Sequence, residues 1–351
     1  MDNVQRMVNY LSESAEHLSP LLILTHDYPD PDALASACAF QYLAEQKFGI
    51  KSRIAYGGII GRMENQEMVR SLKLPVHKLR PSDLNKYPNV VLVDTQPAFG
   101  NNSFPKKRKA TIVIDQHGSV RKPNAEFALI DPDLGATSVF LAQVLLSLKL
   151  AIPQDLATAL VYGILTDTQN LYRAANPLVI TTYTSLLPLC NLKKLARIQN
   201  PSRSRKFFET LLAAIQRAVV QQRLIVTHLG PVETPDLVAQ IADFLLTYKG
   251  MHWSFCTGRF GGNLHVSLRM ARSGGRAGEI LRDIFLDRGH AGGHGRIAGG
   301  TIKISQEAAE DVWISMEQTL TQRLVRRLRV PAKTKPTMPF TGNMDSQGGP
   351  S

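Results

Sequence analysis

Short apolar runs alternate with longer segments of helical spacing between residues 21 and 190. LLILT (21–25), VVLVD (90–94) and TIVID (111–115) have the length and continuous apolar character of buried strands. Helical spacing of apolar positions marks three other segments: ALASACAFQYLAEQKFG (33–49), ATSVFLAQVLLSLKL (136–150) and PQDLATALVYGILTDT (153–168). This alternation predicts an α/β fold with a mainly parallel sheet and helices on its faces.

The pattern changes after residue 190 and predicts a second, smaller α/β domain. A basic segment interrupted by Pro201 and the helical stretch FFETLLAAIQRAVVQQ (207–222) are expected to form a linker and connecting helix over residues 191–222. Strands are indicated by RLIVTHL, HWSFCTG and LHVSLRM, and a glycine-rich stretch, HAGGHGRIAGGTIKI, follows at 290–304. The expected domains are therefore residues 1–190 and 223–330, with a disordered tail at 331–351 that is rich in Pro, Gly, Ser and Lys.

Composition narrows the class of protein. The chain has 351 residues, of which 44% are hydrophobic, and no stretch approaches the roughly 20 apolar residues that span a bilayer. Its N-terminus lacks the basic-then-apolar order of a signal peptide. Cys38, Cys190 and Cys256 are too widely spaced to predict a disulfide framework or a zinc cluster. These features predict a cytoplasmic protein with no membrane partner.

The net charge of +12 favours anionic partners such as phosphates, nucleotides or nucleic acid, without choosing among them. Part of the surplus lies near the C-terminus, where four arginines follow a helical pattern that is typical of a solvated helix face: Arg323, Arg326, Arg327 and Arg329.

Acidic and imidazole side chains follow the apolar runs. LLILT leads to His26, Asp30 and Asp32. VVLVD ends in Asp94, and TIVID ends in Asp115 with His117 close behind. Because the carboxyl ends of parallel strands share one edge, these groups are expected to converge there. Asp167 adds a fourth acidic position at the end of a helical pattern.

Crowded carboxylates need a cation to neutralise them, and a mixed oxygen and nitrogen set suits Mn²⁺, Mg²⁺ or Fe²⁺. The alternative is that these aspartates cap helices or make turns, as Asp30 and Asp32 are placed to do before the following helix.

Five segments in this order resemble the motifs of the DHH phosphoesterase family and its associated C-terminal domain. They are HDYPDPDA, VLVDTQP, IDQHGS, GILTDTQ and HAGGHGRIAGG, spread over residues 20–305. Within that family the arrangement is most similar to the short-RNA nucleases that also dephosphorylate 3′-phosphoadenosine 5′-phosphate.

The resemblance implies a site with two metal ions, expected to be Mn²⁺ with Mg²⁺ as an alternative. His26 and Asp30 would bind the first ion, Asp32 and Asp167 the second, and Asp94 both. Asp115 would support the site by hydrogen bonding, and His117 would contact the substrate phosphate as part of the catalytic machinery. Asp27 has no matching role.

Two residues depart from the family pattern. Gln116 replaces a histidine that would bind the second metal, so this ligand and this ion are both doubtful. Met270 follows Arg269 where the family has a serine.

In the second domain, the resemblance assigns substrate binding to Arg269, Gly292, Gly293 and His294. Glycines let backbone N–H groups approach an anion, and Arg and His add charged donors. A plain glycine-rich turn is the alternative reading of this stretch. Trp253 and Phe255 are expected in the core rather than against a base.

The expected function is metal-dependent hydrolysis of a phosphoester in a short oligonucleotide or small nucleotide, held in a cleft between the two domains. The alternatives are hydrolysis of a cyclic dinucleotide or of pyrophosphate, and a regulatory protein that binds nucleotides without hydrolysing them. A homodimer is possible on this reading.

Overall fold

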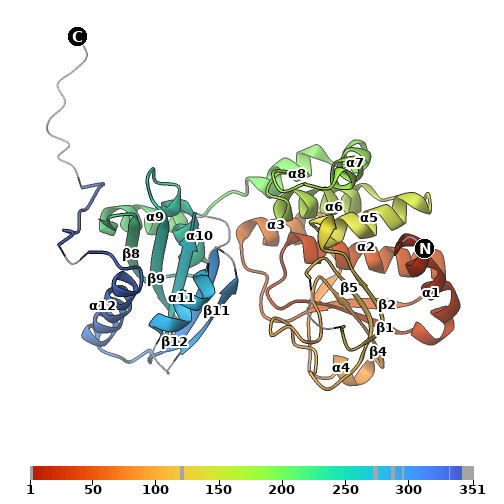
Figure 1. Cartoon of the computed structure of the whole chain (residues 1–351), viewed down its shortest axis with the longest axis horizontal. Coiled ribbons are helices and arrows are strands. Elements are labelled where there is room, and N and C mark those ends of the chain that lie inside the picture. Colours follow the sequence, from red (N-terminus) through yellow and green to blue (C-terminus); the bar gives the residue numbers. More distant parts are fainter. Residues whose placement is uncertain are drawn as a thin grey trace, which may run out of the picture. The chain divides into compact units, whose positions relative to one another are not determined.

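The computed structural model describes residues 3–118, 122–271, 276–285, 289–294, 296–331 and 333–341, and excludes the side chains at 289, 290 and 294 (Figure 1). The chain divides into two compact units, Met1–Pro201 and Ser202–Ser351. Each consists of a six-stranded sheet with helices packed against it, which confirms the predicted pair of α/β domains. The expected cleft between the domains stays a prediction.

Unit 1 contains a sheet and eight α-helices among its described residues. Its strands are β1 (Leu21–Thr25), β2 (Ser52–Tyr56), β3 (Val76–Lys78), β4 (Asn89–Val93), β5 (Ala110–Asp115) and β6 (Ala125–Ile130). Its helices are α1 (Asn3–Leu18), α2 (Pro31–Phe48), α3 (Met63–Ser71), α4 (Asp83–Lys86), α5 (Thr137–Ser147), α6 (Gln154–Asp167), α7 (Pro177–Leu186) and α8 (Leu192–Gln199), with 3₁₀ turns at Pro132–Leu134 and Leu187–Leu189.

All strand pairs of this sheet are parallel, in the order β3-β2-β1-β4-β5-β6. Both faces are covered, and successive residues of β1 show it. Leu21 and Ile23 pack into the core with α2, α5 and α6, whereas Leu22 and Leu24 join a second cluster on the other face. A strand that is buried on both faces reads as a continuous apolar run, which is why the three predicted strands were recognisable.

Unit 2 contains a mixed sheet with helices on both faces. Its strands are β7 (Val219–Gln221), β8 (Leu224–Pro231), β9 (Trp253–Phe260), β10 (Asn263–Met270), β11 (Gly289–His294) and β12 (Ile297–Lys303). Its helices are α9 (Arg205–Arg217), α10 (Asp236–Leu246), α11 (Ala277–Ile284) and α12 (Glu310–Arg327). The strand order is β11-β12-β10-β9-β8-β7, and only β8 and β9 run parallel. Phe255 is fully buried in this unit, and Trp253 packs against the same core, as expected.

The segment expected to be a linker is divided between the two units. Helix α8 belongs to unit 1 because Leu195 and Ile198 are buried in its core. The helix expected over 207–222 ends at Arg217, so that prediction is wrong at its C-terminal end. The β-branched pair Val219 and Val220 starts strand β7 instead.

The tail is ordered further than expected. The backbone of Thr337 bridges that of Val220, and the side chain of Gln221 donates a hydrogen bond to the carbonyl of Thr334. Residues 333–341 therefore add to the β7 edge of the sheet, which offers unpaired backbone groups. None of the described helices has the length and apolar character of a membrane span.

Candidate metal centre

Three adjacent strands deliver the central residues of the site. β1, β4 and β5 lie side by side, and His26, Asp94 and Asp115 stand at or just after their carboxyl ends. From β1 the chain builds the sheet outward through β2 and β3, and from β4 outward through β5 and β6 on the other side. The site thus lies where the strand order reverses, the position at which open parallel sheets bind ligands.

The start of α2 places two further aspartates. Asp30 is the N-cap residue, and its Oδ1 accepts a hydrogen bond of 3.0 Å from the Ala33 N–H. Asp32 lies in the first turn and is buried, where it accepts hydrogen bonds of 2.8 and 2.9 Å from the N–H groups of Thr137 and Ser138. The capping role expected as the alternative is therefore real for Asp30. It is compatible with a metal site, because a carboxylate has several acceptor positions.

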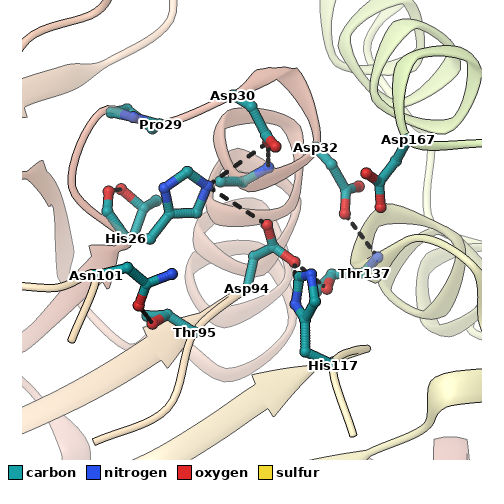
Figure 2. Close-up of polar contacts among 12 residues, drawn as sticks. His26, Pro29, Asp30, Asp32, Asp94, Thr95, Asn101, His117, Thr137 and Asp167 are labelled. Carbon is teal, nitrogen blue, oxygen red and sulfur yellow. Dashed lines mark hydrogen bonds and ion pairs between the residues drawn. The ribbon is translucent and has the colours of Figure 1, made fainter. Parts of the chain in front are cut away.

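Asp94 lies at the centre of the cluster (Figure 2). It is buried, has a left-handed backbone with φ 58°, and accepts a hydrogen bond of 2.8 Å from the Thr137 hydroxyl. Its two oxygens lie 3.7 Å from His26 Nε2 and 3.7 Å from His117 Nδ1. His26 Nε2 also lies 3.8 Å from Asp30 Oδ1. Asp94 therefore connects two groups of candidate ligands.

Asp115 holds His117 in place. Its Oδ1 lies 2.8 Å from His117 Nδ1 and accepts a hydrogen bond of 3.1 Å from the His117 N–H. Its Oδ2 accepts a hydrogen bond of 2.7 Å from Gln96 Nε2, which also donates to the His117 carbonyl at 2.7 Å. The His117 side chain remains half exposed. A half-exposed imidazole fixed by a buried carboxylate is suited to contact a ligand.

Asp167 and Asp32 point toward each other at the side of the cluster formed by α6 and α2 (Figure 2). The amide nitrogen of Gln116 donates a hydrogen bond to Asp167 Oδ2. The structure thus gives Gln116 a role as a hydrogen-bond donor to an expected metal ligand, and its own role as a ligand stays a prediction.

Two sets of side chains in the described part of the chain are close enough to share an ion. One is His26, Asp30 and Asp94, and the other is Asp94, Asp115 and His117. Ligand atoms within each set lie within 4.8 Å of one another. The donors are carboxylate oxygens and imidazole nitrogens, a set that fits Mn²⁺ or a similar divalent ion. The residues present therefore fit the metal expected from the sequence.

The ionisation of the aspartates reflects crowding of negative charge. Burial and the charges of Asp32 and Asp30 raise the pKa of Asp94 well above its usual range. Burial and neighbouring aspartates raise the pKa of Asp167 to about 8, and burial with the charge of Asp30 raises that of Asp32 to about 6. A divalent cation among these carboxylates would favour their charged forms and reverse these shifts.

The two histidines and Asp30 show the opposite tendency, because they attract each other. Burial would lower the pKa of His26, but the hydrogen bond and charge of Asp30 raise it to about 9. Burial likewise opposes ionisation of Asp30, yet its interaction with His26 lowers its pKa to about 2. The hydrogen bond from Asp115 raises the pKa of His117.

The predicted substrate-binding residues of unit 2 lie on β10 and β11. Arg269 is buried at 5% exposure. Its Nε lies 2.6 Å from Asp243 Oδ1, and its Nη1 donates to the carbonyls of Leu268 and Ala298. Protein groups therefore engage the guanidinium that was expected to bind phosphate, and its contact with substrate stays a prediction.

The two glycines differ in their surroundings. A side chain at Gly293 would lie 2.3 Å from the Ile297 carbonyl, so close packing of the strands requires glycine there. Nothing lies within 4 Å of the corresponding position at Gly292, which leaves its backbone open to a ligand. The side chain of His294 lies outside the described part of the structure.

Three residues of the site were not expected from the sequence. Gln96 lies in the quoted segment VLVDTQP, so the motif contained the signal. Thr137 and Ser138 begin α5 and contact Asp94 and Asp32. Their positions follow from the packing of α5 on α2, which local sequence does not reveal.

Comparisons with known proteins agree with this architecture. Residues 221–321 match the DHHA1 domain. The solved structure of an exopolyphosphatase-related protein from Bacteroides fragilis has the same fold. Its TM-score is 0.70 at 14% identity, and the match covers 93% of this chain and 100% of that one.

Two curated relatives match parts of the sequence. An uncharacterized protein of Methanocaldococcus jannaschii, MJ1633, is 34% identical over 292 residues, which are 83% of this chain and 60% of the relative. A "Probable manganese-dependent inorganic pyrophosphatase" of Streptococcus equi subsp. zooepidemicus is 24% identical over 163 residues, 43% of this chain and 49% of the relative. The chain thus spans about half to three fifths of the length of these relatives.

Proposed function

Because this chain belongs to the DHH phosphoesterase family and carries a DHHA1 domain, we propose that it is a metal-dependent hydrolase of phosphoester bonds. The supporting observation is the convergence of aspartates and histidines at the carboxyl edge of the unit 1 sheet. Manganese is the metal we favour, because the donor set suits it and the relative from Streptococcus equi is described as manganese-dependent.

In this proposal His26, Asp30 and Asp94 hold one ion, and Asp32, Asp94 and Asp167 hold a second. When bound, such ions supply Lewis-acid chemistry and neutralise negative charge on a phosphoryl group. The hydrogen bonds to Asp32 from the N–H groups of α5 keep that carboxylate oriented. Thr137 does the same for Asp94 through its hydroxyl.

His117 is the residue we assign to the substrate phosphate. Its Nδ1 faces Asp115, so the ring presents Nε2 on its other side. Its raised pKa favours the imidazolium, in which both nitrogens carry protons. Nε2 is therefore able to donate a charge-assisted hydrogen bond to a phosphate oxygen, while Gln96 and Asp115 keep the ring oriented.

The substrate class we favour is a short oligonucleotide or a small nucleotide such as 3′-phosphoadenosine 5′-phosphate. The order of the sequence motifs, the DHHA1 domain and the surplus of cationic residues support this choice. The three cysteines are free and buried, which supports our further proposal that the protein works in the reducing cytoplasm. Assembly as a homodimer stays a prediction.

Inorganic pyrophosphate is the second candidate substrate, because relatives described as pyrophosphatases match part of the chain. Hydrolysis of a cyclic dinucleotide and nucleotide binding without hydrolysis complete the alternatives. Release of product with added Mn²⁺ should be measured on a dinucleotide, 3′-phosphoadenosine 5′-phosphate, a cyclic dinucleotide and pyrophosphate. We expect the first two to be preferred, and a chelator to stop the reaction. Failure on all four substrates, with retained nucleotide binding, would favour the non-catalytic alternative.

A further inference from the structure

Tyr28 combines an unusual backbone with an unusual exposure. Its φ angle is 59°, in the left-handed region that bulky residues rarely adopt. Its side chain is 65% exposed, although a large aromatic side chain normally gains free energy from burial. A strained conformation that holds an aromatic ring in solvent calls for an explanation other than folding stability.

The loop that carries Tyr28 is fixed on both sides. The Tyr28 N–H donates a hydrogen bond of 3.0 Å to the Gly57 carbonyl, and the Asp27 N–H donates one of 2.6 Å to the Asn101 carbonyl. Asp27 Oδ1 accepts a hydrogen bond of 2.8 Å from the Ser103 hydroxyl and occupies the space that a side chain at Gly57 would need. This gives Asp27 a structural role in place of the absent family role.

Two glycines make room for the Tyr28 ring. A Cβ atom at Gly58 would lie 2.8 Å from ring atoms Cδ1 and Cε1 of Tyr28, so any larger residue would displace the ring. One side of the ring thus rests against the backbone that follows β2, and most of the ring remains open to solvent. The ring is supported and accessible at the same time.

The position of this ring relates it to the metal centre. Gly57 and Gly58 directly follow β2, which is the neighbour of β1 in the sheet, so Tyr28 lies at the same carboxyl edge as the candidate ligands. Tyr28 is two residues from both His26 and Asp30. Figure 2 shows the adjacent Pro29 on the loop between these two ligands.

We propose that Tyr28 is a platform on which a nucleobase of the substrate stacks, and that it makes the site select nucleotides over inorganic phosphates. The inference rests on the proposed function and specifies the substrate class of the same site. A phenol ring carries no charge with which to hold a phosphate, whereas its face packs well against any flat base. Stacking of this kind is tolerant of base identity, so the platform selects for the presence of a base rather than for one base.

The test compares binding of adenosine 5′-monophosphate and inorganic phosphate in the presence of Mn²⁺, by calorimetry, for the whole protein and its variants. Tyr28→Asn removes the ring and keeps a residue that adopts left-handed backbone readily. Tyr28→Gly repeats the test with the residue that this backbone admits most freely. Tyr28→Phe is the matched control, because it keeps the ring and loses only the hydroxyl.

We expect Tyr28→Asn and Tyr28→Gly to reduce the ratio of adenosine monophosphate affinity to phosphate affinity by about 5- to 100-fold, the range for loss of one base stack. Tyr28→Phe should keep that ratio within about twofold of the unmodified protein. An unchanged ratio in the asparagine and glycine variants would overturn the platform. So would equal losses for both ligands, since these would indicate damage to the metal centre.

The outcome is separable from that of the proposed function, because binding is measured without turnover. If no phosphoester is hydrolysed but the ratio falls as described, the platform stands and the hydrolase assignment fails. If nucleotide esters are hydrolysed and the ratio is unchanged, the hydrolase assignment stands and the platform fails.

Discussion

Gln116 donates a hydrogen bond through its side-chain amide to the carboxylate of Asp167, at the point where the family pattern has a histidine. The donor nitrogen is thereby directed at Asp167, and only the amide oxygen remains as an acceptor for a cation. An amide oxygen is a weaker donor to Mn²⁺ than an imidazole nitrogen. The second metal position should therefore bind its ion less tightly than the first.

Replacement of Gln116 by histidine tests this relationship. We expect Gln116→His to tighten the weaker Mn²⁺ step by about tenfold, or about 1.4 kcal/mol, in a calorimetric titration. Gln154→His, at the opposite end of α6, is the matched control and should leave both steps unchanged. Identical stoichiometry and affinity in Gln116→His and the unmodified protein would show that this position does not limit the second site.

Asp94 is expected to be indispensable for hydrolysis and dispensable for folding. Asp94→Asn keeps a residue that tolerates a φ of 58° and removes the charge at the centre of the cluster. Metal-dependent activity should be lost, while the melting temperature of the metal-free protein stays the same or rises because repulsion is relieved. The exposed Asp133→Asn serves as control. Substantial Mn²⁺-stimulated turnover in Asp94→Asn would refute the central role of this residue.

The metal-free protein should lose stability as the pH rises from about 6 to 9. Folding raises the pKa of Asp32 to about 6, of Asp167 to about 8 and of His26 to about 9, so the folded state holds protons that the unfolded state has released. Each such proton lowers the free energy of unfolding by about 1.4 kcal/mol per pH unit within its window.

Added Mn²⁺ should reverse this trend, because the ion replaces the protons. Thermal unfolding with and without Mn²⁺ at pH 6, 7, 8 and 9 checks the prediction. The stabilisation by the metal should increase with pH. A constant difference across this range would mean that these groups do not exchange protons for the ion.

Arg269 should contribute to the stability of unit 2, whatever it contributes to substrate binding. Arg269→Ala would leave Asp243 without this partner and two carbonyls without their donor, at a cost of about 1.5–3 kcal/mol. Thermal unfolding without ligand measures this effect, and Asp243→Asn tests the partner. An unchanged melting temperature with weaker nucleotide binding would instead support the role expected from the sequence.

The sequence revealed most of unit 1 because its strands are buried on both faces and therefore read as apolar runs. Strand β1 was located to the residue, and the acids at the strand ends were identified from their order along the chain. β2 and β3 were not, since their partly exposed residues break the apolar pattern. The role of Thr137 depends on how α5 packs, and that of Gln116 depends on the direction of its amide. Neither is a property of local sequence.

The placement of β1 beside β4 has a consequence for how the protein folds. β2, α3 and β3 separate these strands along the chain, yet the strands are direct neighbours in the sheet. His26 and Asp94 therefore meet only after a long loop has closed, a step that is entropically costly and slow. An ion held by both residues would bind only after this closure and would oppose its reversal. Chelation should consequently accelerate unfolding of unit 1 more than it slows refolding, so that the metal acts as a lock on the last long-range contact to form.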